Sequence, residues 1–508
     1  MEKKLLLINP WQTYEKHLAT EYQSYIPFGL ACIAAIGKNR GFITKIIDCL
    51  SDDTETTIGD KVRFGRTPSE LRNDIIAFNP DIVGISSTFS MFEQDATDVA
   101  KLVKQINHNI IVILGGVTAT LPEIYEPLLQ KYDVYDIMVR GEGELIFSEI
   151  LDKYSKEEHK IIGLPSIKGI AYKDGFAIVS TESCPFICNL DSLPFPSLDL
   201  LDIDKTISNK FYSRWRNNPI GKRSIPVFTS RGCPYNCCFC SVHSQVGYRF
   251  RQYILEYVIE FMKKCIDEYQ IDHFHFEDDN LTFDIERAKE LFKRIAPLHI
   301  SWDTPNGVRA DRIDDEMIQL MINAGITSLS IAAESGNEQV RTEIIHKNLK
   351  TDSIIQTAML CDRYNLPCIV FFVLGFPGET MDNIRETVQF AKMLTMKYST
   401  INMIFIANPL PGTELSKLAK EKGYIKKELS NSDYFVAIRA NQAPIITTEE
   451  FDKKQIFALL QDELDNNDFS VHNINQPMFW YNSDKANNRA RRTFPKLSNR
   501  KIEWKWID

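Results

Sequence analysis

The sequence predicts an α/β protein built from two successive modules, a doubly wound parallel sheet and a partial barrel of six β/α units. Short apolar runs alternate with amphipathic helical patterns from residue 1 to about 150, and again from 223 to about 425. A chain of 508 residues also exceeds what one hydrophobic core usually organises. Its composition, 44% hydrophobic and 25% charged, is that of an ordinary globular protein.

The first module, residues 1–155, contains apolar runs typical of buried parallel strands. Strands are expected at Leu5–Ile8, Thr44–Ile47, Asp81–Ser86 and Ile110–Leu114, and helices at Leu30–Lys38, Gln94–Gln105 and Leu145–Tyr154. In such sheets, ligands bind beyond the carboxyl ends of the strands. The residues expected there are mostly small and let a ligand approach the backbone: Ser86, Ser87, Thr88, Gly115, Gly116, Thr118, Gly141 and Glu142.

A less regular stretch, 156–222, is expected to connect the modules. In the second module, 223–425, six strands are expected at Ile225–Ser230, Phe274–Glu277, Ile300–Asp303, Ser328–Ala333, Cys368–Leu374 and Asn402–Ile406. Helical patterns lie between them, for example at Leu255–Tyr269, Ile285–Arg294, Asp315–Ala324 and Ile384–Leu394. The polar stretch 426–508 shows no pattern that places helices or strands, and we treat it as a small C-terminal region that contacts substrate or caps the barrel.

Three cysteines directly after the first barrel strand carry the strongest chemical signal. Cys233, Cys237 and Cys240 have the spacing C-x-x-x-C-x-x-C, with which three thiolates can hold an iron–sulfur cube and leave its fourth iron open. An alternative on spacing alone is a zinc site with His243 as the fourth ligand. Cys238 is an additional thiol, which we interpret as a small apolar filler.

Polar or glycine-rich sequences follow each of the remaining five strands of the predicted barrel. They are Glu277-Asp278-Asp279-Asn280, Arg309, Glu334-Ser335-Gly336, Gly375-Phe-Pro-Gly378-Glu379 and Asn408-Pro-Leu-Pro-Gly-Thr413. Each has an ordinary explanation as a helix cap, a surface charge or a turn. Because the carboxyl ends of barrel strands meet at one rim, we expect these sequences to form one site with the cysteines.

The second module resembles the radical S-adenosylmethionine superfamily, whose signature is matched by Cys233, Cys237, Phe239 and Cys240. The resemblance implies a TIM-type barrel and a [4Fe–4S] cluster whose open iron chelates S-adenosylmethionine. It also implies that Glu277 and Asp278 meet the amino group of that molecule and Arg309 its carboxylate. Glu334 would bind the ribose, Gly375 and Gly378 would lie near the adenine, and Ser335 is also expected to bind the cofactor.

The first module is similar to the Rossmann-like cobalamin-binding domains that precede such barrels. The likeness rests on Tyr25-Ile-Pro-Phe-Gly29, Asn79-Pro-Asp-Ile-Val-Gly-Ile-Ser86, Gly115-Gly-Val-Thr-Ala-Thr120 and Gly141-Glu-Gly-Glu144. A nucleotide- or flavin-binding sheet is the alternative, although no G-x-G-x-x-G sequence follows the first strand. The Asp-x-His-x-x-Gly loop of ordinary cobalamin methyltransferases is also absent, which leaves the lower face of cobalt without an identified ligand.

The resemblance implies methylation of an unactivated carbon with two molecules of S-adenosylmethionine, one as methyl donor to cobalamin and one as radical source. The alternatives are a cobalamin-dependent radical cyclase that transfers no methyl group and, more remotely, a non-catalytic cobalamin or iron–sulfur sensor. The expected partners are a small-molecule or peptide substrate and a reductant protein such as flavodoxin or ferredoxin. We expect oxygen-sensitive chemistry that needs anaerobic conditions.

Composition and termini limit the remaining classes of function. The net charge of −9 argues against nucleic acid as a partner, and no apolar run is long enough to span a membrane, so we expect a cytoplasmic protein. Cys184 and Cys188 imitate half of the cluster motif and are interpreted as structural. The aromatic run Met478–Tyr481 and the basic tail 484–508 are expected either to contact an anionic substrate or to cap the barrel.

Overall fold

The chain folds into two compact units in a computed structural model that describes residues 2–212, 222–425, 446–464, 469–472 and 478–494. The first unit is Met1–Arg214 with Ser244–Gly247, and the second is Trp215–His243 with Tyr248–Asp508. Each unit contains its own sheet, as the sequence predicts.

The first unit is built on a seven-stranded sheet in the order β12-β11-β8-β7-β6-β1-β3. The parallel strands are β1 (Lys4–Asn9), β3 (Ile43–Asp48), β6 (Ile82–Ser86), β7 (Ile111–Gly115) and β8 (Ile137–Val139). The stretch expected as a connector adds two antiparallel strands, β11 (Ile170–Asp174) and β12 (Ala177–Ser180). Since β3 and β6 flank β1 on opposite sides, the topological switch point lies between β1 and β6.

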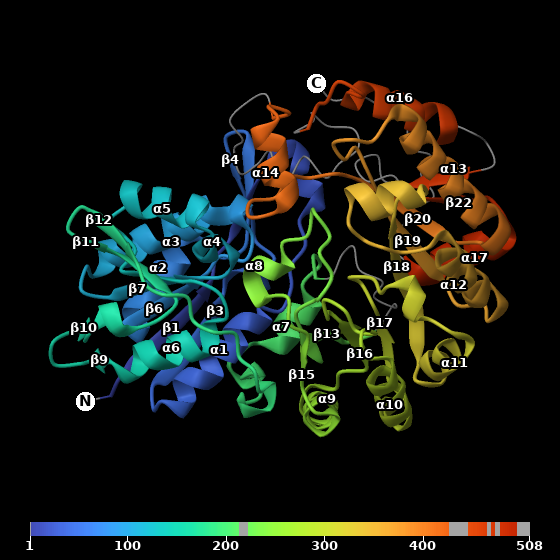
Figure 1. The fold of residues 1–508 in the computed structure, drawn as a ribbon. Coiled ribbons are helices and arrows are strands. Elements are labelled where there is room, and N and C mark those ends of the chain that lie inside the picture. Colours follow the sequence, from blue (N-terminus) through green and yellow to red (C-terminus); the bar gives the residue numbers. More distant parts are fainter. Residues whose placement is uncertain (1, 213–221, 426–445, 465–468, 473–477, 495–508) are drawn as a thin grey trace. The chain divides into compact units, whose positions relative to one another are not determined.

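Helices cover both faces of this sheet (Figure 1). Leu5 and Leu7 of β1 pack in the same core as α1 (Phe28–Asn39) and α6 (Gly143–Asp152). Leu6 and Ile8 point the other way and pack with three further helices, α2 (Pro68–Phe78), α3 (Glu93–Ile106) and α5 (Pro122–Lys131). The two-residue alternation of the strand thus fills two cores, which is why its sequence is apolar throughout.

The second unit contains the six parallel strands that the sequence predicts, each paired with the next. They are β13 (Ser224–Val227), β16 (His273–Phe276), β17 (Ser301–Asp303), β18 (Ile326–Glu334), β19 (Cys368–Leu374) and β20 (Ile401–Ile406). The helices between them are α9 (Leu255–Tyr269), α10 (Ile285–Ile295), α11 (Asp315–Asn323), α12 (Thr351–Arg363) and α13 (Met381–Tyr398). The Trp302 ring stacks on Phe292 of α10 at 4.8 Å, which shows that this side of β17 faces the helices.

The C-terminal region extends the barrel sheet. β22 (Met478–Tyr481) pairs antiparallel with β20 and with β21 (Phe469–His472), and α16 (Lys453–Leu464) packs on α13. In α17 (Asp484–Thr493), Ala486 and Ala490 pack against Met478 and Trp480. Within the described residues, the aromatic run is therefore a packed strand, as the capping interpretation requires.

The only long basic side chain that α17 buries holds this helix at the amino end of the barrel. Arg489 is 1% exposed and donates to Asp362, to Asn365 and to the carbonyl oxygen of Tyr398, all in segments that precede β19 or β20. This end is opposite to the one where the cysteines follow β13. The described part of the basic tail therefore lies away from the predicted site, and residues 495–508 lie outside the described residues.

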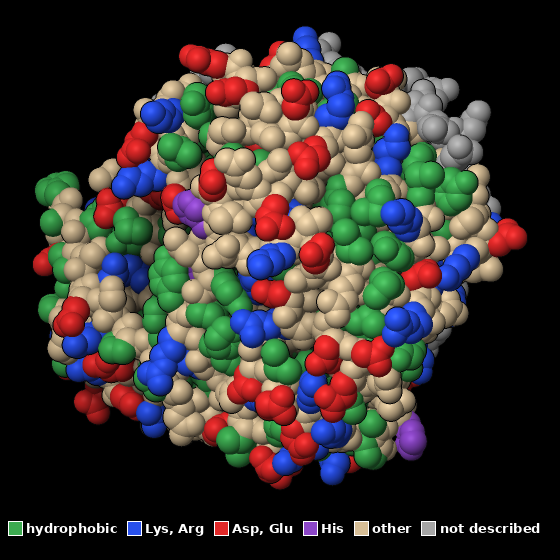
Figure 2. All heavy atoms as spheres, turned by 45° about the vertical axis from the view of Figure 1, so that its right-hand side comes forward, with side chains coloured by type: hydrophobic (Ala, Val, Ile, Leu, Met, Phe, Trp, Pro, Cys, Tyr) green, Lys and Arg blue, Asp and Glu red, His purple; other side chains and the backbone are tan. Residues whose placement is uncertain are grey.

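Among the described residues, no helix is long and apolar enough to cross a membrane. On the face drawn in Figure 2, Lys and Arg side chains are interspersed with Asp and Glu side chains. A mixed surface of this kind does not favour a polyanionic partner on that face. Nucleic acid as an improbable partner stays a prediction.

Candidate functional site

Two carboxylates that follow β16 hold in position the loop that carries the cysteines. Asp278 is 2% exposed and accepts hydrogen bonds from the Thr229 backbone N–H (3.1 Å), from the Thr229 hydroxyl (2.8 Å) and from Ser230. Asp279 accepts from the backbone N–H of Gly232 at 2.9 Å. These bonds fix the turn that leads from β13 into Cys233.

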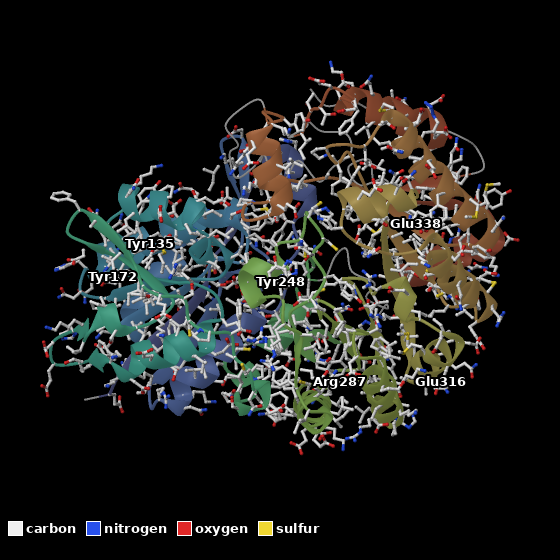
Figure 3. All side chains as sticks on the ribbon, in the orientation of Figure 1. Tyr135, Tyr172, Tyr248, Arg287, Glu316 and Glu338 are labelled. Carbon is white, nitrogen blue, oxygen red and sulfur yellow. The ribbon has the colours of Figure 1, made fainter. Side chains whose placement is uncertain are left out.

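The same turn is held from the helix side by Arg287 of α10, which Figure 3 labels. Its guanidinium donates to the Thr229 carbonyl oxygen at 3.0 Å and to the Tyr253 carbonyl oxygen at 2.8 Å. Sequence reasoning missed Arg287, because an arginine in the first turn of an amphipathic helix resembles any surface charge.

Cys238 differs from its three neighbours in its surroundings. It is 7% exposed and packs with Ile345, Phe376 and Leu415. Its backbone N–H donates to the Ile345 carbonyl oxygen (3.0 Å), and its own carbonyl oxygen accepts from Leu415 (2.9 Å). Burial raises the pKa of the Cys238 thiol to about 12. This environment supports its interpretation as an apolar filler.

Cys233, Cys237 and Cys240 are each partly exposed. Asn280, which is 3% exposed, donates from Nδ2 to the Cys233 sulfur at 3.6 Å, and Nε2 of His243 lies 3.1 Å from the Cys233 carbonyl oxygen. Burial raises the pKa of Cys237 and of Cys240, the latter to about 12. A bound metal centre would supply positive charge that favours the thiolate form.

The donor spacing does not favour the zinc alternative. Within the described chain, one group of three potential metal ligands lies close together. It consists of His273, His275 and Asp303, whose donor atoms all lie within 4.8 Å of one another. The cysteines do not form such a group with His243. A cube needs its three thiolates on three different irons, and hence farther apart than the ligands of one zinc ion.

Arg309 lies beside the cysteine loop and has one unused donor. The guanidinium stacks on the Tyr235 ring at 3.9 Å and donates to Asp311 at 2.8 Å and to the Asn348 carbonyl oxygen at 3.0 Å. Its Nη1 atom is buried and has no acceptor among the described residues. A buried donor without a partner is costly, so this position favours an anionic ligand such as a carboxylate.

Glu334 ends β18 in a strained conformation. Its φ of 65° lies in the left-handed region, which costs a non-glycine residue about 1 kcal/mol or more. The carboxylate accepts a hydrogen bond from Lys347 at 2.7 Å, and both side chains are 7% exposed. Backbone strain at a buried ion pair is typical of a binding site. Lys347 was missed, because its partner lies thirteen residues earlier, beyond the reach of local patterns.

The glycine loop after β19 is closed by its own glutamate. Oε2 of Glu379 accepts from the backbone N–H groups of Gly375 and Phe376, each at 2.8 Å. Gly375 and Gly378 have φ values of 89° and 96°, which favour glycine. The Phe376 ring lies 5.6 Å from that of Phe239, so the glycine loop contacts the cysteine loop.

Not every residue expected to bind a cofactor has an available side chain. Asp278 uses its carboxylate on the Thr229 turn, as described above. Ser335 is fully buried, with its hydroxyl 3.0 Å from that of Thr387 on α13. Glu277 is half-buried at the end of β16, where its carbonyl oxygen accepts from Asn306 at 2.9 Å. These contacts give Asp278 and Ser335 positioning roles, and direct ligand contact by either stays a prediction.

In the first unit, the predicted residues gather at the carboxyl ends of β6 and β7. Ser87 donates to the Thr118 hydroxyl at 2.7 Å, and its backbone N–H donates to the Gly115 carbonyl oxygen at 2.9 Å. Gly116 has a φ of 95°, and a Cβ atom there would lie 2.6 Å from the Ser87 carbonyl oxygen. Gly115 has nothing within 4 Å of such an atom, so its surface is open to a ligand.

Four further predicted residues complete this edge: Ser86, Thr88, Gly141 and Glu142. Ser86 ends β6, and its hydroxyl lies 3.4 Å from that of Thr88, next to the switch point. Gly141 has a φ of 95° and open space above it, and its N–H donates to Thr120 at 3.1 Å. Glu142 accepts from the Ile187 backbone N–H at 2.8 Å and thereby anchors the segment that contains Ile187, which follows β12.

Comparisons with known proteins agree with this arrangement. A Radical SAM superfamily model matches residues 227–391, and a B12 binding domain model matches residues 17–151. The chain is 34% identical over 396 residues to "Uncharacterized methyltransferase PH0819" of Pyrococcus horikoshii, covering 77% of this chain and 78% of that protein. It is 27% identical over 461 residues to the cytidylyl-2-hydroxyethylphosphonate methyltransferase of Streptomyces wedmorensis, with 84% of each covered.

Its fold is similar to that of a solved structure. The match is the radical S-adenosylmethionine methyltransferase TsrM of Kitasatospora setae, with a TM-score of 0.61, 16% identity, and 84% of this chain and 77% of that chain covered.

Proposed function

Because the chain belongs to the cobalamin-dependent radical S-adenosylmethionine enzymes, we propose that it transfers a methyl group to an unactivated carbon of a biosynthetic substrate. Its cofactors are a [4Fe–4S] cluster, S-adenosylmethionine and cobalamin. The observation that carries the proposal is that two relatives named as methyltransferases align with most of this chain. One alignment covers 77% of the chain and the other covers 84%.

The described residues fit these groups. Cys233, Cys237 and Cys240 supply three thiolates, and Arg309 offers its buried, unpartnered Nη1 atom to a carboxylate. In the first unit, the open surface at Gly115 and the close backbone approach at Gly116 suit a large planar ligand above the strand ends. When bound, the cofactors supply the electron, the radical and the methyl group.

The protein's own residues orient these groups. Arg309, held by Asp311 and stacked on Tyr235, would orient one end of S-adenosylmethionine. Glu334 would hold the ribose hydroxyls at the other end, and the loop closed by Glu379 would lie against the adenine. Because radical transfer depends on geometry, a displacement of about 1 Å at any of these points would cost on the order of a hundredfold in rate.

The segment Ser86–Ser90, at the end of β6, contains no histidine. It would therefore offer cobalamin hydroxyl groups but no imidazole ligand. When bound, cobalamin would supply the methyl group.

Anaerobic incubation of the reconstituted enzyme with methyl-labelled S-adenosylmethionine, a reductant and host extract tests the proposal. We expect the label in a carbon-bound methyl group of one small molecule or peptide, detected by mass spectrometry, and no such product with Cys240→Ala. A product formed with S-adenosylmethionine consumption but without the label would instead support the cyclase alternative.

A further inference from the structure

The interior of the barrel contains a cluster of ionisable groups that the proposed function does not use. Along β16, Phe276 points outward to Trp302, with their rings 5.1 Å apart, and Trp302 stacks on α10. Strand alternation therefore turns His273, His275 and Asp303 toward the barrel interior, below Glu277 at the rim.

These three side chains are packed together out of solvent. The exposed fractions of His273, His275 and Asp303 are 0%, 1% and 0%. Nδ1 of His275 lies 2.8 Å from Oδ1 of Asp303, and Nδ1 of His273 lies 2.8 Å from the Ser301 hydroxyl. The remaining nitrogen of His273 faces Oδ2 of Asp303 at 3.8 Å, and neither of these two buried atoms has a hydrogen-bond partner among the described residues.

The Asp303 carboxylate lies between the two imidazoles, with Oδ1 2.8 Å from Nδ1 of His275 and Oδ2 3.8 Å from Nε2 of His273. Among the described residues, its salt-bridge partners are the two histidines, and no Lys or Arg contacts it. A buried carboxylate without a neutralising partner is strongly unfavourable.

We propose that His273, His275 and Asp303 form a divalent metal site of the zinc class, separate from the cluster cysteines and independent of the proposed methyl transfer. Two imidazoles and a carboxylate are a common donor set for such ions, and bonds of about 2.0–2.2 Å place neighbouring donors roughly 3.3–3.6 Å apart. The donor atoms here all lie within 4.8 Å of one another, so small side-chain rotations suffice. The ion links β16 to β17, whose ends carry Glu277 and Asn306.

One of the histidines is already oriented by a hydrogen bond to its other ring nitrogen. The Ser301 hydroxyl holds Nδ1 of His273, which leaves the other nitrogen of this ring for the metal. The protein supplies three ligands, and a water molecule fills the fourth position.

The test uses the full-length chain and a variant in which Cys233, Cys237 and Cys240 are all alanine, so that zinc cannot bind at the cysteines. After loading with zinc and removal of loosely bound metal, we expect one zinc ion per chain in the triple-alanine variant and at least one in the parent chain. In the triple-alanine variant, X-ray absorption should show only nitrogen and oxygen neighbours at about 2.0–2.1 Å, and no sulfur at about 2.3 Å.

His273→Gln and Asp303→Asn, made in the triple-alanine variant, should each weaken zinc binding at least tenfold. The matched control is His299→Asn, since His299 is exposed on the loop before β17. Circular dichroism confirms that each variant is folded. A triple-alanine variant that retains no zinc overturns the proposal, and so does zinc affinity that His273→Gln leaves unchanged. Because these readouts need neither S-adenosylmethionine nor substrate, failure of the methylase proposal would not affect them.

Discussion

Replacing Arg489 by methionine should destabilise the barrel unit without touching its cofactor site. The buried guanidinium donates to the Asp362 carboxylate (2.9 Å), the Asp362 carbonyl oxygen (3.1 Å), the Tyr398 carbonyl oxygen (3.0 Å) and Asn365 (3.3 Å). Methionine fills similar volume but leaves the Tyr398 carbonyl oxygen without its donor, a loss that costs about 1–3 kcal/mol. The Asp362 carbonyl oxygen keeps the Asn365 backbone N–H at 3.2 Å. The Asp362 carboxylate keeps Lys485 at 2.6 Å, which limits the penalty there.

The expected loss is about 1–3 kcal/mol in the free energy of unfolding of the barrel unit. At about 2–4 °C per kcal/mol, the melting temperature should fall by roughly 2–12 °C. Differential scanning calorimetry measures the shift, and Arg491→Met is the matched control because Arg491 is exposed on the same helix. At a temperature where both variants are folded, substrate-independent formation of 5′-deoxyadenosine should equal that of the parent enzyme.

Two results would refute this reasoning. Equal melting temperatures for Arg489→Met and Arg491→Met would show that the buried contacts do not hold α17. A loss of 5′-deoxyadenosine formation with an unchanged melting temperature would show that α17 acts at the cofactor site, as the substrate-contact interpretation of the tail requires.

Three further predictions follow from the site. Cys238→Ala should keep most of the iron and the 5′-deoxyadenosine formation, whereas Cys240→Ala should lose both; equal damage would refute the ligand assignment. Burial raises the pKa of Glu379 to about 7, so the folded state binds a proton more tightly than the unfolded state and loses stability as pH rises from about 4.5 to 7. Glu379→Gln should reduce this pH-dependent change in the free energy of unfolding by a few kcal/mol, measured in denaturant titrations. An unchanged pH dependence would contradict the prediction. Bound cob(II)alamin should show no nitrogen superhyperfine splitting in electron paramagnetic resonance, since the Ser86–Ser90 loop has no histidine, and a split signal would contradict this.

Much of the fold is predictable from the sequence, because buried parallel strands and amphipathic helices leave strong local patterns. The bounds of β19 and α9 coincide with the expected ones residue for residue. We missed α2, although Thr67-Pro68-Ser69-Glu70 is a capping box with proline in the first turn, a local signal that would have identified it.

The C-terminal elements could not be predicted in the same way. α17 is polar, and the contacts that hold it join Arg489 to residues more than 90 positions earlier, such as Tyr398. No local pattern encodes a contact over that distance. The antiparallel pairing of β22 with β20 also joins segments that are far apart in the chain, so no local pattern predicts it.

At the site, the sequence indicates which residues stand at the strand ends but not what each side chain does there. Asp278 and Glu277 are adjacent and chemically alike. The carboxylate of Asp278 accepts hydrogen bonds from the Thr229 turn, whereas Glu277 is half-buried at the rim. The cysteines are different, because three thiols at this spacing predict a metal centre by themselves, and the polar ends of the other barrel strands favour a cluster over zinc. The cytoplasmic location, the reductant protein and the substrate class stay predictions.

The central claim is radical methylation, and the ratio of the two products of S-adenosylmethionine tests it most directly. During substrate turnover under anaerobic conditions, the enzyme should form 5′-deoxyadenosine and S-adenosylhomocysteine in equal amounts for each methylated product, because one molecule supplies the radical and another the methyl group. Quantification of both by mass spectrometry, with Cys240→Ala as the control that abolishes 5′-deoxyadenosine, gives this ratio. Substrate-dependent 5′-deoxyadenosine without matching S-adenosylhomocysteine would contradict methyl transfer.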